Sequence, residues 1–265
     1  MAASGHVTTA PESRPWLGRV ALLRIGFVLA LLVVWEALAA SGLLYQDVVP
    51  SIRKIAAALV AVLADPAFYR NLGVTAYEVA FALAIGGAAG LAIGILIGGS
   101  RFLAAALEHY LYYLGPTPKI IFFPIMIMWF GVGPGSKMAM GALSCFFPVA
   151  LSAAAGMREI DTVLIRVGRS FRASTRQMVA KIYLPAMRAP VINGLRLGLG
   201  IAIIGVLLAE TKLSNQGLGF MIIQAYTLFN MPRMYALLIL VFALAALVNA
   251  GVSKLDQISA PPARQ

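Results

Sequence analysis

The sequence predicts an all-α membrane protein with six transmembrane helices. Of its 265 residues, 61% are hydrophobic and only 12% are charged, and its mean hydropathy is +0.88. Soluble proteins average about 45–50% apolar and about 25% charged residues, so these charges are too few to cover a soluble body of this size. Apolar runs recur at about the 20 residues that a helix needs to cross a bilayer.

Six apolar segments are expected to span the membrane: 20–40, 74–98, 111–131, 136–156, 190–209 and 234–252. Together they form one transmembrane domain at 20–255, with flexible cytoplasmic tails at 1–19 and 256–265. The first segment has an alternative, a cleaved signal peptide, because Ala37-Leu38-Ala39 resembles a small-residue cleavage site. The later spans make the protein membrane-embedded under either interpretation.

Two spans carry special packing signals. Glycines recur every four residues in the second span, which lets another helix approach closely; they are Gly86, Gly90, Gly94 and Gly98. The third span is interrupted by Gly115-Pro116-Thr117-Pro118. Proline removes a helix donor, so we expect a kinked helix there. Broken backbone at membrane depth is tolerated only where it is buried in protein or lines a cavity.

Two connections are expected on the outer side. Residues 52–64 have amphipathic spacing and include Arg53 and Lys54, which favour a helix lying in the membrane interface. Residues 210–232 contain Gly217-Leu218-Gly219 and are expected to form a loop.

The basic residues indicate the orientation. Most of the 21 lysines and arginines fall in the tails or in connections on the same side as the tails. The positive-inside rule therefore places both termini and the segment 157–189 in the cytoplasm. An odd number of spans would put that basic segment and one terminus on opposite sides.

The inventory of reactive side chains excludes most enzyme classes. Cys145 is the one cysteine, and the two histidines, His6 and His109, lie far from it in sequence, so we expect no metal site. No catalytic motif and no phosphate-binding loop is present, so we expect no catalytic residue and no cofactor in this chain. A secondary transporter or channel driven by an ion gradient is the alternative function. It would call for inverted repeats and paired intramembrane charges, whereas the sequence shows no internal repeat and its intramembrane acids are limited to Glu36, Glu78 and Glu210 near span ends.

The segment 157–189 has the pattern of a docking surface. It contains seven basic residues and only two acidic residues, Glu159 and Asp161. Two short helices are expected, at about 159–172 and 174–183. Apolar residues recur at helical spacing among the charges, which predicts an apolar ridge with a basic rim; they are Val163, Leu164, Val167, Phe171, Met178, Val179 and Ile182. Nucleic acid is not an expected partner, because the basic residues flank apolar spans instead of forming a stripe on a soluble face.

Ile182-Tyr183-Leu184-Pro185 resembles the end of the cytoplasmic coupling loop in permeases of bacterial binding-protein-dependent ABC importers. In that family the loop reads Glu-Ala-Ala, three residues, Gly, nine residues, then Ile-x-Leu-Pro. Counting back places the Glu-Ala-Ala on Arg166-Val167-Gly168 and the glycine on Arg172. Other segments resemble the nitrate/sulfonate/taurine group, over nearly the whole chain: Pro116 to Lys119, Pro124, Trp129-Phe130-Gly131, Ser136-Lys137, Phe146-Phe147-Pro148, Ala209-Glu210-Thr211 and Gly217-Leu218-Gly219.

The resemblance implies a type I ABC importer permease-like fold in the bacterial inner membrane. The implied partners are an ATPase dimer that holds ATP and Mg, a second permease copy in a homodimer or heterodimer, and a periplasmic or lipid-anchored solute-binding protein. The solute would be a small anion such as a sulfonate, nitrate or bicarbonate. The implied ATPase-coupling residues are Arg166, Val167, Gly168, Arg169, Ser170, Phe171, Arg172, Ile182, Leu184 and Pro185.

The sequence departs from the family at Arg166 and Arg172, which stand where the family has glutamate and glycine. Glycine at the second position would permit a tight turn. Arginine there carries a conformational cost unless it adopts an ordinary right-handed helical or extended geometry. The predicted solute-path residues lie in the broken third span, the fourth span and the start of the 210–232 segment: Thr117, Lys119, Ser144 and Glu210.

Overall fold

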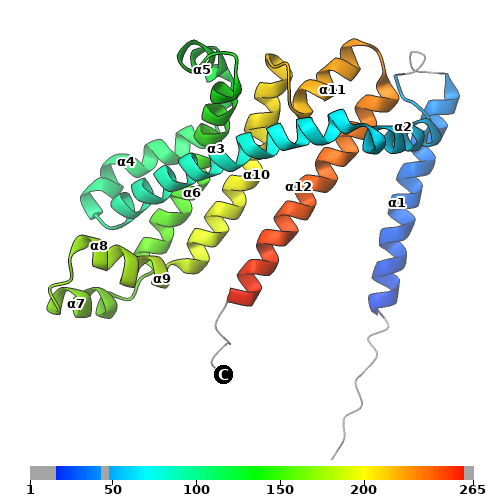
Figure 1. Ribbon diagram of the computed structural model, residues 1–265. Helices are drawn as coiled ribbons and strands as arrows, with labels where there is room; N and C mark the ends of the chain where they lie inside the picture. The colour runs from blue at the N-terminus through cyan, green and yellow to red at the C-terminus, as the bar shows by residue number, and fades with distance from the viewer. Residues whose placement is uncertain (1–15, 43–47, 260–265) are drawn as a thin grey trace, which may run out of the picture. The chain divides into compact units, whose positions relative to one another are not determined.

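The computed structural model describes residues 16–42 and 48–259, with side chains described from residue 20 to residue 252 within those ranges. Every regular element in the described residues is helical (Figure 1). The chain divides into two compact units, Met1–Ala57 and Ala58–Gln265, and each is considered by itself. Residues 1–15 and 260–265 of the predicted tails lie outside the described residues, and 16–19 and 256–259 belong to helices α1 and α12.

The first unit contains α1 (Trp16–Ser41) and the start of α2 (Ile52–Ala64). Residues 20–41 of α1 are apolar enough to cross a membrane, as predicted for the first span. Glu36 accepts a hydrogen bond from the Ile52 backbone N–H at 2.9 Å, and Trp35 Nε1 donates to the Pro50 carbonyl at 3.0 Å. The Glu36 carboxylate thus caps the first turn of α2, whose N–H groups have no partner within the helix.

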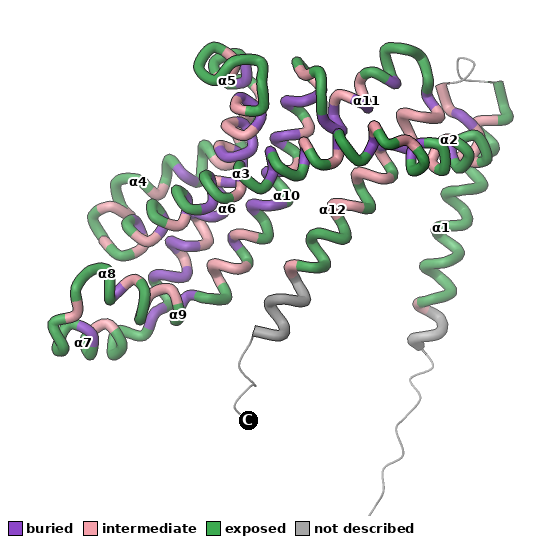
Figure 2. Tube along the Cα trace, in the orientation of Figure 1, coloured by how far each residue is buried: buried purple, intermediate pink, exposed green. Residues whose placement is uncertain are grey.

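The core of the second unit is made by α3 (Pro66–Gly98), α6 (Pro134–Arg158) and α10 (Arg188–Lys212). The glycine ladder of α3 lies directly against α6. A Cβ added at Gly90 would lie 2.7 Å from the Phe146 carbonyl oxygen, and one added at Gly94 would lie 2.5 Å from that of Ala150. The predicted close helix packing is therefore confirmed, and α6 is the partner (Figure 2).

The far side of α6 repeats this arrangement with α10. A Cβ added at Gly205 would lie 2.6 Å from Ser144 Oγ, and one added at Gly198 would lie 2.8 Å from the Val149 side chain. The α6 residues between the two neighbours are small and fully buried, including Cys145 and Ala150. Small residues let the backbones meet, and this contact supplies the attraction that apolar burial cannot supply within lipid.

The third predicted span is broken, not simply kinked. It consists of α4 (Arg101–Leu114), the short 3₁₀-helix η1 (Lys119–Phe122) and α5 (Phe123–Phe130), and the two halves are bent by 93°. The break coincides with Pro116 and Pro118, which supply no backbone N–H. Arg158 of α6 pairs with Glu108 of α4 through two contacts of 2.5 and 2.6 Å. Over the described residues, five helices can span a membrane, or six if the bent pair counts as one span.

The expected loop at 210–232 was wrong in part, because it contains helix α11 (Leu218–Thr227). This helix has ten residues, too few to cross the hydrocarbon, and Gly217 and Gly219 at its start are residues typical of turns. Its inner face buries Leu218, Met221 and Ala225 against Phe68 of α3 and Leu237 of α12 (Met231–Ser259).

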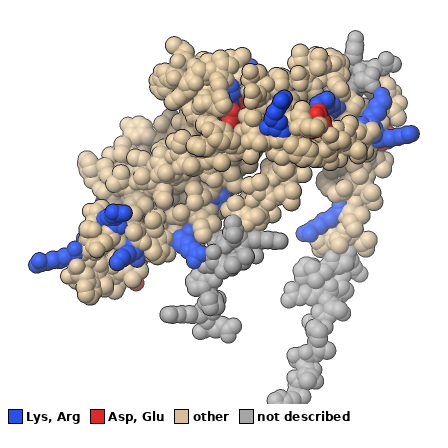
Figure 3. Space-filling view, in the orientation of Figure 1, with Lys and Arg blue, Asp and Glu red and all other residues tan. Residues whose placement is uncertain are grey.

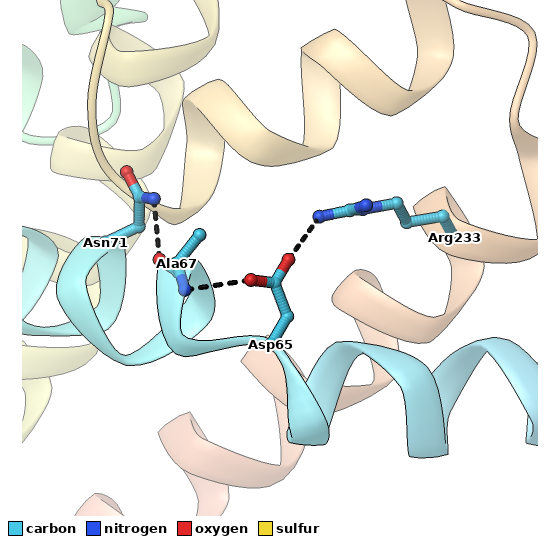
Figure 4. Close-up of polar contacts among 4 residues, drawn as sticks. All are labelled: Asp65, Ala67, Asn71 and Arg233. Carbon is cyan, nitrogen blue, oxygen red and sulfur yellow. Dashed lines mark hydrogen bonds and ion pairs between the residues drawn. The ribbon is translucent and has the colours of Figure 1, made fainter.

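The N-terminus of α3 is tied to the start of α12 (Figure 4). Asp65 accepts a hydrogen bond from the Ala67 N–H at 2.9 Å and forms an ion pair with Arg233 at 3.0 Å. One carboxylate therefore caps a helix and joins two helices.

The basic segment folds as α7 (Thr162–Ser170), α8 (Thr175–Met178), the π-helical turn η2 (Val179–Tyr183) and α9 (Leu184–Ala186). The two predicted short helices correspond to α7 and to the continuous run from α8 to η2. These elements lie at one end of the second unit, and α5 and α11 lie at the opposite end (Figure 1).

The contact between α3 and α6 generates the first testable prediction. Gly94→Ala should lower the free energy of unfolding by about 1–3 kcal/mol, because the added methyl group meets backbone atoms of α6 that cannot easily give way. Gly73→Ala is the matched control, since a Cβ at Gly73 of the same helix meets nothing within 4 Å. Thermal unfolding of the two purified variants measures the difference, and equal midpoints would contradict the packing described.

Candidate functional site

Helix α7 is fixed at its start by Asp161, which accepts a hydrogen bond from the Val163 N–H at 2.8 Å. Its inner face is held by contacts with α6 and with the α8–η2 run. Ile165 packs in a cluster with the buried Met157 and Met187, and a Cβ added at Gly168 would lie 2.6 Å from Met178 Sδ. A side chain at this position would displace the ends of Ile182 and Met178, so α7 packs closely against the α8–η2 run.

The segment that follows α7, from α8 to η2, is also well defined by hydrogen bonds. Ser174 and Gln177 form a capping box at the start of α8, with bonds of 2.8 and 3.3 Å. In the π-helical turn η2, the Leu184 N–H donates to the Val179 carbonyl. Pro185 follows directly and cannot donate, and π turns often occur where a regular helix is interrupted at functional positions. Ile182 and Leu184 are half-buried here, while Pro185 is exposed.

The outer face of α7 exposes an apolar stripe, which we define as Val163, Leu164, Val167 and Phe171. The Phe171 side chain is 83% exposed. On the neighbouring face Arg166 and Arg169 are exposed, and Ser170 uses its hydroxyl to donate to the Arg166 carbonyl. Figure 3 shows lysine and arginine side chains on this end of the second unit. An apolar stripe beside positive charge is the composition of a protein-docking surface.

Arg172 ends α7 in the left-handed conformation, with φ of +50°. Its N–H donates to the Arg169 carbonyl at 2.9 Å, and the Ala173 N–H donates to the Gly168 carbonyl at 3.0 Å. This pair of bonds is the Schellman motif, in which glycine usually occupies the left-handed position. An arginine there costs about 1–2 kcal/mol. The sequence left open whether Arg172 would avoid this cost, and the structure shows that it does not.

A second polar site lies at the opposite end, between α3, α10 and α11. Three consecutive N–H groups at the start of α11 donate to three side chains. Gly217 N–H donates to Asn71 Oδ1 at 2.7 Å, Leu218 N–H to Thr75 Oγ1 at 2.8 Å and Gly219 N–H to Glu210 Oε2 at 2.6 Å. We call Asn71, Thr75 and Glu210 the α11 anchor. They satisfy the donors that a buried helix start leaves open.

The α11 anchor is internally connected. Thr75 Oγ1 donates to Glu210 Oε1 at 2.7 Å. The Asn71 amide donates to the Ala67 carbonyl at 2.8 Å (Figure 4), which leaves its oxygen free for Gly217. All three side chains are buried, and Glu210 is fully so. A buried carboxylate in a spanning helix is costly unless it is bonded, and here each of its oxygens has a donor.

Glu78 and Lys137 lie beside the anchor, on α3 and α6, and are 2% and 1% exposed. Lys137 Nζ donates to the Val132 and Gly133 carbonyls, and its charge acts on both Glu78 and Glu210. Glu78 Oε2 has no hydrogen-bond partner. The ammonium group offsets part of the buried negative charge, which otherwise carries a large desolvation cost.

The four predicted path residues do not converge on one hollow. Thr117 and Lys119 lie in the break between α4 and α5, where their side chains donate to the carbonyls of Tyr113 and of Gly115, respectively. Ser144 is buried against α10 and donates to the Met140 carbonyl. Glu210 lines a hollow of about 390 Å³ between α10 and α11, together with Lys212 and Gln224. Their role in a solute path stays a prediction.

The fold defines a polytopic membrane protein, and the exposed apolar stripe of α7 lies at one of its ends. A family model described as "Binding-protein-dependent transport system inner membrane component" matches residues 86–258. The chain belongs to this family.

Curated relatives agree with that family. The aliphatic sulfonates transport permease protein SsuC of Bacillus subtilis (strain 168) is 29% identical, over 86% of this chain and 82% of its own length. The taurine transport system permease protein TauC of Escherichia coli (strain K12) is 28% identical over 92% and 91%. The nitrate import permease protein NrtB of Synechococcus elongatus (strain ATCC 33912 / PCC 7942 / FACHB-805) is 26% identical over 82% and 78%.

The fold also has a solved counterpart. A chain of the inward-facing MetNI methionine ABC transporter superposes with a TM-score of 0.62 at 20% identity, covering 77% of this chain and 98% of that one. This similarity shows the type I permease fold.

The α11 anchor generates the second prediction. Glu210→Ala should lower the free energy of unfolding by about 2–5 kcal/mol, because it leaves buried donors of Thr75 and Gly219 without acceptors. Amide hydrogen exchange at residues 217–219 should accelerate at the same time. Glu159→Ala, at an exposed glutamate, is the control. Unchanged exchange at 217–219 would show that Glu210 does not hold α11.

Proposed function

We propose that this chain is the permease subunit of an ABC importer and that α7 is the helix by which a separate ATPase drives it. The observation that carries this proposal is the exposed apolar stripe on a helix that is otherwise rigidly fixed. Capping by Asp161 and close packing at Gly168 hold α7 in place. Its stripe finds no cover within the described residues, and such a surface is typical of a binding site for another protein.

The connections of α7 provide a route by which a movement of the bound ATPase would reach the membrane-spanning helices. Helix α9 runs on into α10 through backbone bonds from Met187 to Tyr183 and from Val191 to Met187. Helix α10 in turn packs on α6 along Gly194, Gly198 and Gly205. ATP and Mg held by the partner ATPase dimer would bias two arrangements of these packed helices, one open inward and one open outward.

The remaining partners are proposed from the family to which the chain belongs. A second permease, either another copy of this chain or a related chain, would complete the solute path. A periplasmic or lipid-anchored binding protein would deliver solute at the end that carries α5 and α11. The basic α7–α9 end would face the cytoplasm, with both termini on that side of the bacterial inner membrane.

The solute is proposed to be a small anion such as a sulfonate, nitrate or bicarbonate. Relatives named for aliphatic sulfonates, taurine and nitrate support this class. Another relative is named for formylaminopyrimidine transport, so pyrimidines are the second class of solute to be tested. Calorimetry of the binding protein with each compound separates the two classes, and binding of the pyrimidine without any of the anions would contradict the anion proposal.

The docking role generates the third prediction. Phe171→Asp should reduce the amount of ATPase that co-purifies with the chain by at least about tenfold, because the most exposed aromatic side chain of the stripe is lost and a charge is placed in an apolar contact. Membrane insertion should be unchanged, since Phe171 makes little contact within its own chain.

The matched control is Phe229→Asp, at an exposed phenylalanine after α11 at the opposite end. Equal ATPase recovery from both variants would contradict the assignment of α7. ATP-independent uptake driven by an ion gradient in vesicles would favour the alternative, a secondary transporter or channel.

A further inference from the structure

We propose that Arg172 binds a carboxylate of the ATPase, so that the groove that receives α7 is acidic where it meets the end of this helix. This inference rests on the proposed function and goes beyond it, because it specifies the chemistry of the partner surface. It concerns the position at which the family carries glycine.

The first observation is that Arg172 has a strained backbone, while its side chain makes no polar contact with a described residue. Arg172 occupies the left-handed position of a Schellman motif, which glycine adopts without penalty. Its side chain is exposed and makes no hydrogen bond or ion pair among the described residues. Strained residues at exposed surfaces often belong to binding sites. No described residue compensates for an arginine at this position, which points to a binding partner.

The second observation is the charge around Arg172. Arg166 and Arg169 of α7 and Arg176 of α8 are exposed, and none of them forms an ion pair with a described acidic group. Asp161 is already engaged with the Val163 N–H. The surface is positive and open, and a carboxylate-bearing partner complements it. A guanidinium can hold a carboxylate with two parallel hydrogen bonds, which fixes orientation as well as charge.

The third observation distinguishes a protein partner from lipid headgroups. Arg172 directly follows Phe171, the most exposed member of the apolar stripe. An aromatic side chain next to an arginine is the composition enriched at the centre of protein interfaces. The membership of this chain in an importer family supplies a protein that must dock on the cytoplasmic side.

The test uses the variant Arg172→Gly, which should make the permease more stable and should weaken its binding to the ATPase. The full-length chain is placed in nanodiscs of neutral phosphatidylcholine, and the ATPase that co-purifies with the wild type is titrated against it. The midpoint of thermal unfolding of the permease alone should rise by about 2–4 °C, because strain is relieved. The dissociation constant for the ATPase should increase by roughly 3- to 10-fold, and this difference should shrink at high salt.

Phe229 supplies the matched control, because it occupies the same left-handed Schellman position after α11, with φ of +56°. Phe229→Gly should raise the unfolding midpoint similarly and leave the affinity for the ATPase unchanged. This variant separates relief of strain from loss of a binding group.

The outcomes are distinct. Wild-type affinity in Arg172→Gly would overturn this inference while the proposed function stands. An affinity loss that appears only in nanodiscs containing anionic phosphatidylglycerol would also overturn it, by assigning Arg172 to the lipid surface. Failure of the wild-type chain to bind any ATPase would contradict the proposed function itself.

Discussion

The close contact of α3 with α6 is the interaction on which the rest of the structure depends. Lipid tails are as apolar as leucine, so helices in a membrane are held by intimate packing and by polar bonds, not by removal of apolar surface from water. Glycines at four-residue spacing bring the α3 backbone against the α6 carbonyls, and Gly198 and Gly205 do the same for α10. The three helices form a closely packed frame, with the exposed stripe of α7 at one end and the α11 anchor at the other.

The two ends of this frame are built differently. At one end, α7 is packed on its inner face and exposed on its outer face, which suits the proposed docking of an ATPase. At the other end, the α11 anchor satisfies three N–H groups at the start of a helix too short to span. Lys137 of α6 and Glu78 of α3 beside it are buried as well, and Lys137 donates to the carbonyls of Val132 and Gly133.

Much of the fold could be predicted from the sequence, because several of its features depend only on residues close together in the chain. The glycine ladder, the proline break and the amphipathic α7 follow from spacing that a single helix imposes. The resemblance at Ile182-Tyr183-Leu184-Pro185 places the glycine of the family at Arg172, and Arg172 adopts a left-handed backbone conformation. The 93° bend and helix α11 were missed. The contacts of the α11 anchor join residues 135 to 146 positions apart, and no periodicity in one sequence reports such a pairing.

The central claim is that α7 receives the ATPase, and site-specific cross-linking tests it most directly. The one cysteine, Cys145, is fully buried, so Phe171→Cys supplies a single accessible thiol in the full-length chain. A maleimide–photoreactive cross-linker on that thiol should yield an adduct with the ATPase, in an amount that changes when ATP is added. An ATPase adduct from Phe229→Cys and none from Phe171→Cys would contradict the account.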